Sequence, residues 1–111
     1  MDVVFKLDST GHQTVLYSFK GGTDGITPWA GVTRDAAGNL CGPTTTCGAA
    51  NAGVVYKLET VGQLTVLHTF TGGADGAHPY AGVIGDGAGN LYGTTSVGGQ
   101  QDSGVVFKLS P

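Results

Sequence analysis

The chain has 111 residues, of which 40% are hydrophobic and 12% are charged, and its formal net charge is −3. This composition argues against a disordered chain, and no apolar run is long enough for a membrane span. There is no basic footprint, so we do not expect nucleic acid as a partner. The 21 glycines recur at fixed positions of a repeat, which indicates turns rather than a flexible linker.

One pentapeptide occurs three times along the chain. Residues 3–7 read VVFKL, residues 54–58 read VVYKL and residues 105–109 read VVFKL, a spacing of 51 residues. A period of this length marks a repeat protein, whose units bury their apolar faces against one another. The chain therefore divides into three parts that form one array: repeat 1 (1–51), repeat 2 (52–102) and the first strand of a third repeat (103–111).

Each repeat contains four strand signals. In repeat 2, residues 54–58 are β-branched or aromatic, and residues 64–70 alternate apolar and polar side chains, which predicts a hairpin. A third strand is expected over 80–84 and a fourth over 91–95, joined by the Asp-Gly-Ala-Gly-Asn turn at 86–90. Glycine or β-branched residues interrupt every window that could form a helix.

The predicted fold class is all-β, with tandem repeats of four antiparallel strands. Four short strands in about 50 residues, repeated in tandem, are typical of a β-propeller blade. A β-solenoid-like stack is the alternative, although it would use shorter coils and regular parallel stacking.

An ordered series of motifs extends over essentially the whole chain. The segments GVVFKL, TVLYSF, GGxDG, PxAGV and DxxGNLYGTT together resemble the GloVer-type (Gloeo/Verruco) tandem repeat. Residues 83–92 also look like the strand–turn–strand of NHL-type propeller blades. The resemblance implies a propeller-like bacterial protein, secreted or at the cell surface, although no signal peptide pattern is visible after Met1. Repeat 1 departs from the pattern at Cys41, Pro43 and Cys47, which suggests a remodelled last strand and following loop.

The phase of the repeat suggests how copies could associate. In NHL-like strand order the chain reads C–D, A–B–C–D, A–B–C, which is one whole blade and parts of two others. Propellers generally need four to eight blades, and open strand edges can pair with another chain. The spare third copy of the strand favours β-strand addition to a neighbour, whereas an excerpt of a longer array would explain it without assembly. The predicted assembly strands contain Val3, Val4, Phe5, Leu7, Val105, Val106, Phe107 and Leu109.

The leading functional hypothesis is an extracellular, non-enzymatic structural module that self-associates into a fibre or ring, so that its partners are other copies of itself. The alternative is a carbohydrate- or surface-binding propeller, in which the equivalent aromatics Trp29 and Tyr80 stack on a sugar. Asp24 and Asp75, in the GGxDG loops, could donate oxygens to a ligand. One carboxylate per loop is far short of a calcium site.

No catalytic pattern recurs in both repeats. Because neither Ser-His-Asp order, nor paired carboxylates, nor a phosphate loop recurs in both repeats, we expect neither an enzyme nor a cofactor. A hydrolase or lyase whose site is assembled from several chains is the third hypothesis. Cys41 and Cys47 are six residues apart and have no counterparts in repeat 2. They form either a local disulfide or unpaired thiols, because too few further ligands are present for zinc.

Overall fold

The computed structural model describes residues 3–20, 28, 30–35, 37–46 and 51–110. In these ranges the chain forms nine β-strands and no helix, so none could cross a membrane as a helix. The strands are β1 (Val3–Leu7), β2 (Gln13–Ser18), β3 (Thr33–Arg34), β4 (Leu40–Thr44), β5 (Val54–Leu58), β6 (Leu64–Thr69), β7 (Ile84–Gly85), β8 (Leu91–Thr94) and β9 (Val106–Leu109).

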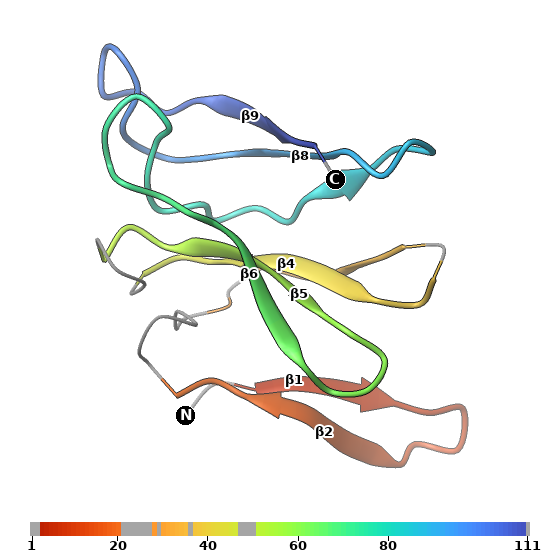
Figure 1. Ribbon diagram of the computed structural model, residues 1–111. Coiled ribbons are helices and arrows are strands. Elements are labelled where there is room, and N and C mark those ends of the chain that lie inside the picture. The colour runs from red at the N-terminus through yellow and green to blue at the C-terminus, as the bar shows by residue number, and fades with distance from the viewer. Residues whose placement is uncertain (1–2, 21–27, 29, 36, 47–50, 111) are drawn as a thin grey trace.

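The strands form three antiparallel sheets in chain order. Their strand orders are β1-β2, β3-β4-β5-β6 and β7-β8-β9, which we call the first, middle and third sheets. Figure 1 shows the three sheets stacked, with the middle sheet between the other two. The all-β fold class is confirmed, and the strand sets match the predicted order C–D, A–B–C–D, A–B–C.

Four hairpins share one turn. At Asp86 the backbone N–H donates to the Asn90 carbonyl at 3.0 Å, and the Gly89 N–H donates to the Asp86 carbonyl at 3.2 Å. Gly89 has a φ of 88°, as expected for a type I turn followed by a glycine bulge. The turns that begin at Asp8, Asp35 and Glu59 make the same two bonds. The Asp-x-x-Gly pattern, with Glu59 in place of Asp in one of the four turns, therefore sets the turn and, with it, the hairpin register.

The third strand of the repeat is shorter than the predicted 80–84. The strand β7 contains only Ile84 and Gly85. The preceding residues contact the middle sheet instead: the Val83 carbonyl accepts a hydrogen bond from the Thr33 hydroxyl. A Cβ on Gly82 would lie 3.2 Å from the Gly31 carbonyl oxygen, so the two backbones lie close together. These contacts between neighbouring sheets take the place of a longer ladder.

The last strand of repeat 1 is regular despite its departures from the repeat. The five residues of β4 pair with β5 without a register shift, and Pro43 lies opposite Val55. The expected remodelling of this strand is therefore wrong. Proline is accommodated because β3 pairs only with Leu40 and Cys41, so no β3 residue faces position 43. Residues 47–50 of the following loop lie outside the described ranges.

Two hydrophobic clusters join the sheets. One contains Val4, Phe19, Tyr56 and Leu58 and lies between the first and middle sheets. The other lies between the middle and third sheets and is formed by Cys41, Ala52, Val55, Phe70, Ala77, Val83 and Leu91, with Phe107 and Leu109 packed against it. Alternate side chains of β5 thus enter opposite clusters, which is why the middle sheet is buried on both faces.

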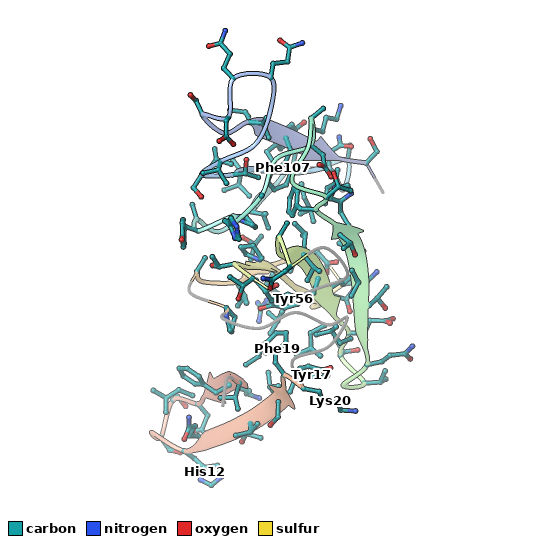
Figure 2. The ribbon with its side chains drawn as sticks, turned by 90° about the vertical axis from the view of Figure 1, so that its left-hand side faces the viewer. His12, Tyr17, Phe19, Lys20, Tyr56 and Phe107 are labelled. Carbon is teal, nitrogen blue, oxygen red and sulfur yellow. The ribbon has the colours of Figure 1, made fainter. Side chains whose placement is uncertain are left out.

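An aromatic contact recurs at both interfaces. The Phe19 ring, just after β2, meets Tyr56 of β5 edge to face with centroids 5.3 Å apart. One repeat later, Phe70 follows β6 and meets Phe107 of β9 at 5.2 Å. Figure 2 shows Phe19 between the first hairpin and Tyr56, with His12 at the far tip of that hairpin. The two interfaces are therefore built by one rule, 51 residues apart.

A glycine beneath each aromatic completes the contact. Gly93 of β8 lies opposite Phe107, and a Cβ at Gly93 would lie 2.6 Å from the Phe107 ring. Gly42 and Tyr56 form the equivalent pair in the middle sheet. Among the described residues, no strand lies beside β1 on the side away from β2, so Phe5 has no equivalent glycine partner there.

Candidate functional site

The two outer sheets each end in a copy of VVFKL at an open edge. The strand β9 pairs only with β8, and β1 pairs only with β2, among the strands that the structure describes. In the middle sheet the equivalent strand β5 has a neighbour on each side. Compared with β5, the described part of β1 has a neighbour only on the β2 side, and that of β9 has a neighbour only on the β8 side.

The backbone groups of β9 alternate between its partner and the open edge. The Thr95 N–H donates to the Val105 carbonyl at 2.9 Å, and the Val105 N–H donates to the Thr95 hydroxyl at 3.1 Å. Residue 105 therefore points both groups toward the β8 side. Because direction alternates along a strand, residues 106 and 108 point theirs toward the open edge. No strand lies on that side in the described part of the chain.

Apolar side chains on the outer sheets are exposed where their repeat equivalents are buried. Val106 is 81% exposed, whereas Val55 at the same repeat position is 0% exposed. Phe5 is 55% exposed, whereas the equivalent Tyr56 is 1% exposed. Leu7, Val15 and Ile84 are also exposed. Each of the two outer surfaces thus carries residues of a type that the internal interfaces bury.

The eight predicted assembly residues fall into three groups. Val4, Phe107 and Leu109 already pack within the chain, in the two clusters described above. Phe5, Leu7 and Val106 are exposed, and Val3 and Val105 are half-buried. Sequence reasoning missed Ile84, Val15 and Lys108. Comparison with their repeat equivalents, Thr33, Val66 and Lys57, could have identified them, because these equivalents lie on strands of the four-stranded middle sheet.

The predicted loop ligand Asp75 serves its own loop. One or other of its carboxylate oxygens accepts bonds from the Thr71 hydroxyl at 2.6 Å, the Thr71 N–H at 3.1 Å and His68 Nε2 at 3.0 Å. Partial burial opposes ionisation, but the bonds from Thr71 and His68 prevail and lower the pKa of Asp75. Both oxygens are engaged, and no group of three or more metal-ligating side chains occurs within the described ranges. Asp24, the equivalent in repeat 1, lies outside them.

The aromatic pair proposed for sugar stacking is described only in part. Tyr80 is 48% exposed and follows the buried Pro79, while Trp29 lies outside the described residues. A half-exposed tyrosine is compatible with stacking on a ligand, and this role stays a prediction.

A cleft of about 620 Å³ opens between the middle and third sheets. Arg34, Asp35, Lys57 and Asp86 are among its lining residues. The Asp86 carboxylate accepts bonds from the Asn90 amide, the Asn90 N–H and the Tyr92 hydroxyl, which hold its pKa well below 3.8. Asp35 is held in the same way by Asn39, so both carboxylates are committed to their turns and neither is placed to act as a general base.

Cys41 also lines the cleft, and its side chain is buried. Burial and the nearby Asp35 carboxylate raise the pKa of the thiol, which disfavours the nucleophilic thiolate. Its thiol is free in the structure. Cys47 lies outside the described residues, and its pairing with Cys41 stays a prediction.

The profile of the Gloeobacter/Verrucomicrobia repeat matches residues 2–111. The chain belongs to this repeat family. The resemblance noted from its motifs is thereby confirmed at the level of the family. Neither a curated protein nor a solved structure matches the chain.

Proposed function

We propose that this chain is a non-enzymatic structural module that self-associates through the strand edges of its outer sheets into a fibre or ring. Its sheets act as propeller-like blades, and the family resemblance supports a bacterial extracellular location. The partner is another copy of the chain.

The observation that carries the proposal is the contrast between identical repeat positions. Val55 is fully buried because the third sheet covers it, whereas Val106 is 81% exposed. The sequence neighbours of Val55 and Val106 are alike, since each follows a valine and precedes an aromatic residue and a lysine. A surface of this kind is normally covered by a further unit of the repeat. Burial of apolar area then drives association.

The two open strand edges determine the symmetry of the contact between copies. In the part of the chain that the structure describes, β1 has no neighbour on the side away from β2, and β9 has none on the side away from β8. Because these two edges differ, the contact is heterologous rather than two-fold. Heterologous contacts produce closed rings or open filaments, depending on the rotation between copies.

Light scattering after size exclusion tests the proposal. The expected result is a mass several times the 11.1 kDa of one chain, increasing with concentration through the micromolar range. A constant monomer mass over that range would reject self-association. Electron microscopy of the assembled fraction then distinguishes a ring from a filament.

A further inference from the structure

We infer that copies join by strand exchange, in which β9 of one copy takes the place of β1 on β2 of the next. This inference rests on the proposed self-association and specifies its contact. The product is one four-stranded sheet shared between two chains.

The strand sets of the outer sheets are complementary. The third sheet contributes β7-β8-β9, and β2 of the next copy adds the missing fourth strand. The resulting order, β7-β8-β9-β2, reproduces the β3-β4-β5-β6 order of the middle sheet. Direct pairing of β9 with β1 would instead place two copies of the same strand side by side. The middle sheet offers no precedent for that arrangement.

The two competing strands have the same sequence. Both β1 and the segment 105–109 read VVFKL, whereas the middle copy differs at Tyr56. Each side chain that β1 places against β2 is thus available from β9. Phe5 pairs with Val15 and Lys6 with Thr14, so Phe107 and Lys108 would occupy these positions after exchange. The exchange replaces one set of ladder bonds by an identical set.

The backbone groups of β9 point the right way. Residues 106 and 108 direct their N–H and carbonyl groups to the open edge, away from β8. Val4 and Lys6 are their equivalents in β1, the strand that pairs with β2. The strand β9 can therefore bind β2 while it keeps all its bonds to β8.

The exchange also covers exposed apolar surface. In the single chain, Val4 is buried against the middle sheet. After exchange Val106 occupies that position, and the rest of the third sheet is carried onto the middle sheet of the next copy. The released β1 takes with it Phe5 and Leu7, which are exposed before exchange as well. Val106 becomes buried as Val4 is released, so the net gain in buried apolar surface comes from the rest of the third sheet, including Ile84, which is 67% exposed in the single chain. This gain offsets the entropy lost on association.

Proline substitution at one position of the two identical strands provides the first test. Val106→Pro removes an N–H that faces the open edge, which edge strands tolerate, but it blocks pairing with β2. We expect the concentration for half-assembly to rise about tenfold or more. Val4→Pro weakens the β1–β2 pair that must open, so half-assembly should occur at lower concentration. Val106→Ile, which keeps the N–H, the β-branch and an apolar side chain, is the control and should assemble as the unsubstituted chain does.

A disulfide test does not depend on tolerance of proline. In a Cys41→Ala, Cys47→Ser background, Lys6→Cys with Thr14→Cys locks β1 on β2 within one chain. Oxidation should then hold the protein as a monomer, and reduction should release assembly. Lys108→Cys with Thr14→Cys should instead form intermolecular disulfides that give a ladder of multimers on a non-reducing gel.

The outcomes separate the two proposals. A monomeric unsubstituted chain rejects the proposed function. Assembly of the unsubstituted chain that persists when β1 is locked on β2, or that Val106→Pro leaves unchanged, rejects strand exchange but leaves self-association standing. Assembly that persists in either of these variants would favour face-to-face stacking of intact outer sheets.

Discussion

Phe70 and Phe107 meet edge to face with ring centroids 5.2 Å apart and ring planes 68° apart. The pair Phe19 and Tyr56 repeats this geometry at 5.3 Å and 70°. Each Phe follows the last strand of one sheet and contacts the VVYKL or VVFKL strand of the next, β5 or β9. This contact fixes how successive sheets stack.

The first prediction concerns that contact. Phe70→Ala removes a fully buried ring and should destabilise the chain by roughly 3–5 kcal/mol, because the surrounding sheets cannot collapse onto the cavity. Phe5→Ala is the matched control, since the ring is more than half exposed, and should change stability by about 0.5 kcal/mol or less. Urea unfolding measures both. Equal losses for the two variants would contradict the stacking described.

The second prediction concerns the glycine beneath Phe107. Gly93→Ala places a Cβ 2.6 Å from the ring and 3.1 Å from a Val83 methyl. The ring must move, at a cost of about 1–3 kcal/mol. Gly87→Ala is the control, because its Cβ would meet nothing within 4 Å. Thermal unfolding should show a lower midpoint for the first variant alone, and an unchanged midpoint there would mean that the ring does not lie over the glycine.

The third prediction concerns the buried threonine at the end of β4. The Thr44 hydroxyl accepts the Val54 N–H at 3.2 Å, and Thr95 does the same for Val105. Thr44→Val keeps the shape of the side chain but leaves this buried N–H without its acceptor, at a cost of about 1–3 kcal/mol. Thr65→Val, on the exposed surface of β6, should be close to neutral. Denaturant midpoints that coincide would show that the hydroxyl is dispensable.

The fourth prediction concerns acid stability. Side-chain bonds from Asn90 and Tyr92 lower the pKa of Asp86 from 3.8, and Asp35 and Asp8 are lowered by analogous turn bonds. A depressed folded-state pKa contributes stability above the unfolded value, and this contribution is lost as the pH falls below it. The urea midpoint should be flat from pH 7 to about 5 and should fall below about pH 4.

Substitution at Asp86 tests whether its turn carries part of that effect. Asp86→Asn cannot lose the charge-dependent bonds on acidification, so its midpoint should fall less steeply below pH 4. Tyr92→Phe removes one donor and should give an intermediate slope. Identical slopes for all three proteins would place the acid sensitivity elsewhere.

Much of the fold follows from local sequence. The Asp-x-x-Gly turns and the VVFKL runs predict the hairpins and their phase, because each depends on a few neighbouring residues. The length of β7 does not follow, since Val83 and Gly82 are held by residues about 50 positions earlier. Nor does Pro43, which is tolerated only because β3 stops short of it.

The candidate site shows the same limit more clearly. Phe5 and Phe107 occupy identical pentapeptides, yet one is exposed and the other packs on Phe70. Their difference arises from which sheet lies beside each strand. Motifs predict that the strand recurs, but only the arrangement of sheets shows which copies have open edges.

Amide hydrogen exchange as a function of concentration tests the central claim most directly. In the single chain the amides of Val106 and Lys108 face the open edge, whereas those of Val4 and Lys6 pair with β2. Association by strand exchange predicts that protection appears at Val106 and Lys108 and is lost at Val4 and Lys6 as the chain assembles. Assemblies in which Val106 and Lys108 still exchange freely while Val4 and Lys6 stay protected would contradict it.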